Sequence, residues 1–344
     1  MKETRDAVSE AACRACRIIN TMLTLTRIVL NKYCKAWGFA LGLAFLTACS
    51  TVQGPVAVPP VTPPQVQPVV LAPVMRAPRL GLALGGGAAR GFAHVGVIQV
   101  LEENGIRPDF LTGTSAGSLV AALYASGKTP TELERVAMSM DEVTLTDWAL
   151  PILGRGLLRG DALARYVSQA VDGRTIETMA LPLGVLATDL GTGQGVLFRR
   201  GDVAQAVRAS SAVPGLFAPV GIAGREYVDG GLVAPVPVQQ ARDMGAEVVL
   251  AVDISSAPEG NLAVGNIRVL LQTFAIMGQS INRHELATAD VVVRPALAGV
   301  GSADFASRKR SIEAGRAAML AALPQLKIQL ARLKPVNGAV GARP

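Results

Sequence analysis

Short apolar runs alternate with helix-like stretches along the chain from Arg79 onward. In six of these runs the apolar residues are consecutive rather than at every second position, which is typical of strands buried on both faces of a sheet. The expected strands cover 80–84, 109–113, 183–189, 196–200, 247–253 and 290–295. The expected helices lie near 90–104, 116–127, 130–140, 161–171, 202–209, 236–244, 265–287 and 308–332. This alternation predicts an α/β fold of three layers, in which helices cover both faces of a mostly parallel sheet.

A separate apolar run lies near the N-terminus, well before the alternating strands and helices. Lys32 and Lys35 precede AWGFALGLAFLTA, whose 13 residues are fewer than the roughly 20 that span a bilayer. A positive flank, a short apolar run and small residues at its end are typical of an export signal. Residues 1 to about 21 do not look like the start of such a signal, and Met22 is an alternative first residue.

The apolar run ends in Leu-Thr-Ala-Cys49, which resembles the cleavage box of bacterial lipoproteins, where the cysteine is lipidated and becomes the first mature residue. In such proteins Ser50, rather than an aspartate, favours outer-membrane delivery in a Gram-negative cell. We therefore expect residues 1–49 to be an N-terminal extension and lipoprotein signal peptide. The protein is then lipid-anchored to the membrane of the bacterial cell envelope, facing the periplasm. The alternative is a plain signal peptide or membrane-proximal helix in which Cys49 is incidental.

Eight prolines lie between residues 55 and 78. Proline fixes φ and lacks the backbone donor, so we expect residues 50–78 to form an extended linker. The folded domain is expected over 79–335, and a flexible tail over 336–344.

The net charge of +7 does not indicate a nucleic-acid-binding protein. The first 49 residues carry seven Lys/Arg and three Asp/Glu, which leaves +3 for the rest of the chain, and no basic cluster interleaved with aromatic residues follows. All four cysteines lie in the same segment, where the Cys13/Cys16 pair lacks the second pair or histidine that a zinc site needs. We expect no nucleic acid, no metal and no cofactor, and the sequence identifies no protein partner.

A candidate catalytic segment follows the second expected strand. It reads Gly113-Thr-Ser115-Ala-Gly117 and leads into an expected helix. This is a G-x-S-x-G pattern in strand–turn–helix context, in which a tight turn exposes a serine hydroxyl at the C-terminal end of the strand. Small residues flank the serine because the turn brings the strand and helix backbones close together. Ser115 is therefore a candidate nucleophile. The alternative is a turn serine that merely caps the helix.

A serine nucleophile needs a base. The chain has two histidines, His94 in the helix after a glycine-rich loop and His284 in a polar helix near the C-terminus. Either would serve as the base only in an unusual geometry, so we expect both to be structural. The remaining candidate for the base is the carboxylate of an aspartate. Asp229, followed by two glycines, is the favoured candidate, and Asp189 is the alternative.

Three elements in this order resemble the patatin-like phospholipases of the bacterial lineage. They are the glycine-rich loop at 85–91, the serine elbow at 113–117 and the Asp-Gly-Gly at 229–231, and the similarity covers about residues 79–295. The resemblance implies a serine acyl hydrolase acting on acyl lipids such as phospholipids or lysophospholipids. It also implies a Ser–Asp dyad without histidine, with Ser115 as the acyl-accepting nucleophile and Asp229 as its base.

The glycine-rich loop lacks the Gly-Lys-Ser/Thr ending of a phosphate-binding loop, and no acidic residue closes the following strand. By the resemblance it forms an oxyanion hole from backbone N–H groups. The expected donors are the amides of Gly86, Gly87, Ala88 and Ala116. Arg90 and Gly91 take the places of the basic residue and the last glycine of the loop, which they are expected to support. Ala88 replaces the middle glycine, and its amide still donates if its φ is negative.

The expected reaction is attack of the serine on an ester carbonyl, followed by hydrolysis of the acyl-enzyme by water. Because the base is a carboxylate of reference pKa about 4, activity is expected to persist below pH 6, where a histidine-dependent hydrolase fades. Three alternatives remain open. They are transfer of the acyl group to an alcohol, a non-catalytic envelope scaffold with this fold, and an acyl-carrier transacylase with a histidine partner downstream.

Overall fold

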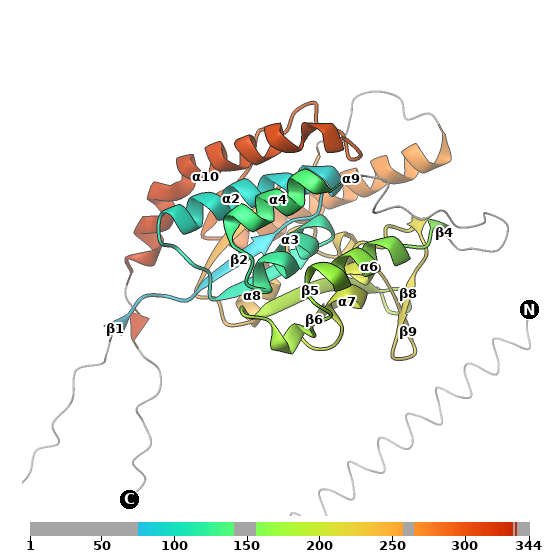
Figure 1. Ribbon diagram of the computed structural model, residues 1–344, viewed down its shortest axis with the longest axis horizontal. Coiled ribbons are helices and arrows are strands. Elements are labelled where there is room, and N and C mark those ends of the chain that lie inside the picture. Colours follow the sequence, from blue (N-terminus) through green and yellow to red (C-terminus); the bar gives the residue numbers. More distant parts are fainter. Residues whose placement is uncertain (1–74, 141–155, 257–264, 333, 336–344) are drawn as a thin grey trace, which may run out of the picture. The chain divides into compact units, whose positions relative to one another are not determined.

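The computed structural model describes residues 75–140, 156–256, 265–332 and 334–335 (Figure 1). The expected signal peptide with Cys49, most of the expected linker and the expected tail lie outside these residues. Within the described ranges, no helix combines the length and the apolar character needed to cross a membrane.

An eight-stranded sheet runs through the centre of the domain, in the order β11-β10-β2-β3-β5-β9-β8, with β6 also paired to β5. The parallel strands are β11 (Val291–Val293), β10 (Val248–Val252), β2 (Leu80–Leu84), β3 (Phe110–Thr114) and β5 (Leu183–Asp189). Antiparallel pairing adds β6 (Gly195–Phe198), β8 (Val220–Ile222) and β9 (Arg225–Asp229). The sheet is therefore mixed but mostly parallel, as the sequence predicts.

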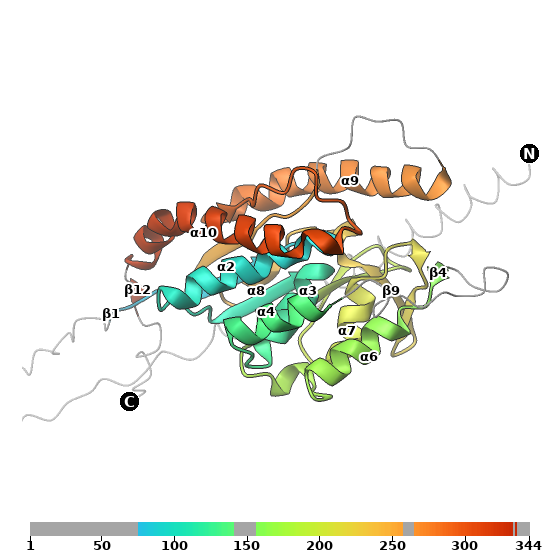
Figure 2. The ribbon, with the colours of Figure 1, turned by 45° about the horizontal axis from the view of Figure 1, so that its top comes forward.

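Helices and short elements surround this sheet (Figures 1 and 2). The α-helices are α2 (Phe92–Glu103), α3 (Ala116–Ala125), α4 (Pro130–Ser139), α6 (Asp161–Ala170), α7 (Val203–Ser210), α8 (Val238–Asp243), α9 (Asn266–Glu285) and α10 (Arg308–Leu330). Single 3-10 turns are η1 (Ala88–Gly91), η2 (Ile176–Thr178), η3 (Gly230–Leu232), η4 (Leu286–Thr288) and η5 (Phe305–Ser307). Two further strand pairs are β1 (Met75–Arg76) with β12 (Lys334–Pro335), and β4 (Gly156–Leu158) with β7 (Gly215–Phe217).

The two faces of β2 show how the layers are built. Leu80, Leu82 and Leu84 point into the large core shared with α2, α3 and α10, whereas Ala83 packs into a smaller core with α8. Side chains of a strand alternate between faces, so a strand with apolar residues at every position requires a helical layer on each side. The predicted three-layer α/β arrangement is confirmed.

Helices α2 and α10 lie side by side on one face (Figure 2). A Cβ added to Gly96 of α2 would lie 2.0 Å from the carbonyl oxygen of Ile312, and one added to Gly315 of α10 would lie 2.0 Å from that of Ala93. Glycine is therefore required on both helices for their backbones to approach this closely.

Six of the described strands escaped the sequence prediction, namely β1, β4, β7, β8, β9 and β12. Three of them have only three residues, and β7 begins at a glycine with φ of 81°. Such short segments show no periodicity over a useful window, so pairing with distant strands decides their conformation.

Candidate active site

Ser115 lies at the turn between β3 and α3, with φ of 52° and ψ of −123°. This backbone conformation is unfavourable for a residue with a side chain, and such strain is common at functional sites. The Ser115 side chain makes no capping hydrogen bond to α3, so the alternative of a helix-capping serine is wrong. A Cβ on Gly117 would lie 2.1 Å from the carbonyl oxygen of Leu84, and one on Gly113 would lie 2.5 Å from Ser118 Cα. The elbow therefore requires glycine at both places.

Strand β5 brings Asp229 to the serine elbow. On one edge of β5, Leu186 pairs with Thr114 of β3, and the next residue, Ala187, pairs with Asp229 of β9. The other edge of β5 pairs with β6. Strands β3 and β9 thus end against each other along one edge of β5, and the residue after Thr114 is Ser115. The structure therefore brings together the two residues that the sequence singles out.

The carboxylate of Asp229 is buried, with 7% of the residue exposed. Its Oδ1 accepts a hydrogen bond of 2.7 Å from the N–H of Gly231. Burial raises the pKa of Asp229 from 3.8 to about 6, against the opposing effects of the Gly231 N–H and of a hydrogen bond with the Ser115 side chain. The carboxylate is therefore in contact with the serine and loses its proton near neutral pH.

The alternative carboxylate, Asp189, is engaged elsewhere. Its Oδ2 pairs with Arg225 Nη1 at 2.9 Å, and its Oδ1 accepts from the N–H groups of Gly191 and Thr192. The hydrogen bond from Arg225 is the main cause that lowers the pKa of Asp189. Both oxygens therefore stabilise the β5–β6 turn and the β9 strand.

Neither histidine stands beside the serine as a base. His94 is fully buried, and its Nε2 lies 2.8 Å from the carbonyl oxygen of Gly85, to which it donates as a neutral ring. Burial lowers the pKa of His94 to about 4, against a smaller raising effect of the Gly85 carbonyl. His284 is exposed in the last turn of α9. His94 therefore holds the start of the glycine-rich loop.

Hydrogen bonds within the glycine-rich loop show which amides are available. The N–H of Gly86 donates to the carbonyl oxygen of Pro235 at 2.9 Å, so the expectation that it lines an oxyanion hole is wrong. The N–H of Arg90 donates to the carbonyl of Gly87 at 3.2 Å and closes the loop. Gly91 is required because a Cβ there would lie 2.9 Å from that of Ala116.

The amides of Gly87, Ala88 and Ala116 donate no hydrogen bond within the described part of the chain. Ala116 is the first residue of α3, where an N–H has no acceptor in its own helix. Ala88 has a φ of 50°, so the negative φ that its role as a donor was expected to require is not met, although its N–H is free of any acceptor among the described residues. The alanine adopts the left-handed conformation that a glycine would take more easily, and its side chain lines the cavity described below.

Ser210, at the end of α7, holds the nucleophile turn and was not singled out from the sequence. It is fully buried, and its Oγ accepts from the N–H of Ser115 at 2.9 Å and donates to the carbonyl of Leu186 at 2.6 Å. Two residues later, the carbonyl of Ala212 accepts from the N–H of Asp229 at 3.0 Å. A serine pair in a small-residue segment, Ser210-Ser211 before Ala-Val-Pro-Gly, is the only local feature of the sequence at this point.

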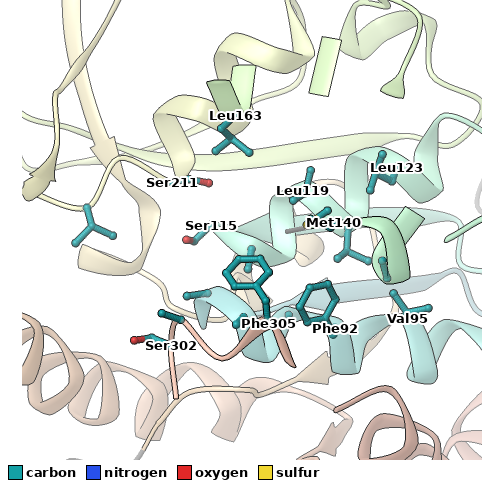
Figure 3. Close-up of a pocket in the computed structure, with 18 of the residues that line it drawn as sticks. Phe92, Val95, Ser115, Leu119, Leu123, Met140, Leu163, Ser211, Ser302 and Phe305 are labelled. Atoms are coloured by element: carbon teal, nitrogen blue, oxygen red, sulfur yellow. The ribbon is translucent and has the colours of Figure 1, made fainter. Parts of the chain in front are cut away.

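A cavity of about 440 Å³ opens beside the serine. Figure 3 shows Ser115, Ser211 and Ser302 toward one end of it and Leu123 and Val95 toward the other. Apolar side chains from α2, α3 and α4 line part of the cavity, together with residues of α6, β7 and η5. No group of three or more His, Cys, Asp or Glu suited to a metal ion occurs among the residues that the structure describes. The site therefore combines a serine, a carboxylate and an apolar cavity.

Comparisons with known proteins place this site in a family. A family model described as Patatin-like phospholipase matches residues 82–242. An uncharacterized NTE family protein of Mycobacterium tuberculosis is 37% identical over 183 residues, which are 53% of this chain and 51% of that protein. Patatin-like phospholipase domain-containing protein 6 of Mus musculus is 33% identical over 192 residues, 54% of this chain and 14% of that protein. The chain thus spans about half the length of the bacterial relative and less of the mouse protein.

Among solved structures, that of VipD from Legionella pneumophila matches with a TM-score of 0.48 and 14% identity, over 72% of this chain and 67% of that chain. The residues matched by the family model contain the glycine-rich loop, the serine elbow and Asp229. Residues 82–242 form a patatin-like phospholipase domain, as the sequence motifs predict.

Proposed function

We propose that the protein is a serine acyl hydrolase that cleaves carboxylic ester bonds of lipids, with phospholipids or lysophospholipids as substrates. The main support is the contact between Ser115 on its strained turn and the buried carboxylate of Asp229, beside an apolar cavity. The family supports lipid hydrolysis in general. No cofactor is needed for this chemistry.

In the proposed reaction, Ser115 Oγ attacks the ester carbonyl while its proton passes to the carboxylate of Asp229. A base with a pKa of about 6 is mostly deprotonated at pH 7 and still close enough in pKa to take up a proton in the transition state. The protonated carboxyl then gives its proton to the leaving alcohol. Water attacks the acyl-enzyme in the same way, releases the fatty acid and restores the serine.

The negative oxygen of each tetrahedral intermediate is assigned to the amides of Gly87, Ala88 and Ala116. Each lacks an acceptor among the described residues, and Ala88 and Ala116 line the cavity beside the serine. Losing one such donor typically costs about 10²–10³ in turnover.

The other candidate activities have less support. An acyl-carrier transacylase needs a histidine at the serine, whereas His94 donates to the Gly85 carbonyl and His284 is exposed at the end of α9. A non-catalytic scaffold does not account for a buried carboxylate in contact with a strained serine. Transfer of the acyl group to an alcohol uses the same dyad and differs only in the acceptor.

Mass spectrometry of mixed bacterial lipids, incubated with the purified full chain, tests the proposal. Free fatty acid and the deacylated lipid should accumulate, and Ser115→Ala and Asp229→Asn should each reduce the rate at least about 10³-fold. Ser126→Ala is a matched control, because Ser126 lies at the opposite end of α3 and its Oγ donates to the carbonyl of Leu123. A new ester of an added alcohol in place of free acid would favour the transferase, and unchanged activity in Ser115→Ala would overturn the dyad.

For the cellular location, we propose lipid attachment at Cys49 and an outer-membrane position facing the periplasm, on the lipoprotein-like box. Mass spectrometry of the protein from fractionated envelopes should find an acylated N-terminal peptide that begins at Cys49. Cys49→Ala should abolish both the modification and the membrane attachment. An intact N-terminus upstream of Cys49 would contradict this proposal.

A further inference from the structure

We propose that the cavity holds an acyl chain and that the side chains at its far end, above all Leu123, limit the chain to about ten carbons. This inference rests on the proposed function and adds to it the part of the substrate that the enzyme selects. It is supported by the lining and the length of the cavity.

The side chains that line the cavity indicate which part of a lipid it binds. Among the described residues that line the cavity, none is charged, and the polar side chains are those of Ser115, Ser211 and Ser302. These serines lie toward the end where the ester would sit (Figure 3). Beyond them, Leu119, Leu123 and Val95 offer no hydrogen-bonding group. A hydrocarbon chain gains free energy there, whereas a polar head group would lose its hydration.

Helix α3 measures the length of the cavity, because it begins directly after the nucleophile. Ser115, Leu119 and Leu123 lie four residues apart and all line the cavity. Eight residues of α-helix span about 12 Å. A fully extended chain advances about 1.2 Å per bonded backbone atom, so this distance corresponds to about ten carbons.

The volume of the cavity is compatible with this occupant. It measures about 440 Å³, within the range of about 300–1,000 Å³ that is typical of pockets for small ligands.

Buried side chains close the far end. Leu123 and Val95 are each 3% exposed, and Leu133 is 1% exposed. Leu133 lies in the first turn of α4, which follows α3 after a short connection, so it is near the end of α3. A larger side chain at Leu123 would shorten the cavity, and a smaller one would lengthen it.

The test is the ratio of kcat/KM for p-nitrophenyl decanoate to that for the butyrate, measured on the full chain in a fixed detergent concentration. Within the wild-type series from acetate to palmitate, kcat/KM should rise roughly two- to fourfold per added methylene and stop rising at about ten carbons. Leu123→Phe should lower the ratio about tenfold and move the maximum to shorter chains. Leu123→Ala should move the maximum to longer chains, and Val95→Phe should act like Leu123→Phe.

Leu101→Ala is the matched control, since Leu101 is a fully buried leucine of α2 that does not line the cavity. Its ratio should equal that of the wild type even if the variant is less stable, because a ratio within one preparation is independent of the folded fraction. A flat wild-type series, or unchanged maxima in both Leu123 variants, would overturn the inference while leaving the hydrolase intact. Absence of hydrolysis of every ester, together with no reaction of Ser115 with a fluorophosphonate, would overturn the proposed function and this inference with it.

Discussion

Burial reverses the usual order of the pKa values of Asp229 and His94, an aspartate and a histidine near the serine elbow. The pKa of Asp229 rises to about 6, and that of His94 falls to about 4. In both cases the main cause is desolvation, which disfavours the charged form. The carboxylate is therefore a better base at this site than a free aspartate, and the histidine stays neutral. The sequence contains both residues but not their burial, and the expectation of activity below pH 6 rested on an unshifted carboxylate. With the pKa of Asp229 raised to about 6, we now expect activity to fall below that pH.

The first prediction is a pH profile. The logarithm of kcat/KM should rise with slope of about 1 up to about pH 6 and then level off, because Asp229 is a base only after losing its proton. Initial rates on a soluble butyrate ester from pH 4 to 9 measure this. His94→Gln should keep the same midpoint, since its amide can still donate to Gly85. If that variant loses the midpoint, a histidine is part of the mechanism.

The second prediction concerns Ser210, which touches the nucleophile only through its backbone. Ser210→Ala leaves the buried N–H of Ser115 without its acceptor, at a cost of about 1–3 kcal/mol, so the turn should lose its alignment. We expect kcat to fall about 10- to 100-fold with little change in KM. Steady-state kinetics on a soluble ester, beside Ser126→Ala, separate the two constants. A Ser210→Ala enzyme with full kcat would contradict the positioning role.

At the scale of elements, the sequence predicts the helices and the parallel strands but not how Asp229 reaches Ser115. Every described α-helix except α8 spans two or more turns, and the five parallel strands are mostly apolar runs. The approach of Asp229 depends on β9 pairing with β5 across 41 residues, as in the 2.8 Å bond from Thr188 Oγ1 to the carbonyl of Asp229. Such pairing has no local signature, and the family resemblance alone linked the two residues.

The third prediction concerns the crossing of α2 and α10. Gly96→Ala places a methyl group 2.0 Å from the backbone oxygen of Ile312, which cannot rotate away. The helices must separate, so the free energy of unfolding should fall by about 3 kcal/mol or more. Gly278→Ala in α9 is the matched control. Its Cβ would meet Pro235 at an ordinary 3.4 Å, and helix propensity favours alanine. Equal stability of the two variants in urea unfolding would contradict the close crossing.

At the scale of the whole molecule, catalysis and stability favour different protonation states of Asp229. Catalysis needs the charged carboxylate, whereas the folded state is more stable with the carboxyl protonated. The folded chain keeps a proton on this carboxyl between pH 3.8 and about 6, where the unfolded chain has released it. Stability from this group is therefore greatest at low pH and falls as the pH rises through that window, by roughly 3 kcal/mol in total. His94 acts in the opposite sense. Its contribution is complete above pH 6.5 and is lost as the pH falls toward 4.

The fourth prediction follows from this opposition. Asp229→Asn removes the buried charge, so the variant should be more stable than the wild type at pH 8 by roughly 1–3 kcal/mol. The difference should shrink toward pH 4, where the wild-type carboxyl is protonated. Urea unfolding of both proteins at the two pH values measures it, and other titrating groups cancel in the comparison. A difference independent of pH would contradict the raised pKa.

The most direct test of the account is the rate at which a fluorophosphonate labels the protein, followed by peptide mapping. The account predicts label on Ser115 alone, at a rate that rises with pH to a plateau with a midpoint near 6. In Asp229→Asn the rate should be lower by about 10² or more and should not show that midpoint. Label on another residue, or full-rate labelling of Ser115 in Asp229→Asn, would contradict activation of the serine by this carboxylate.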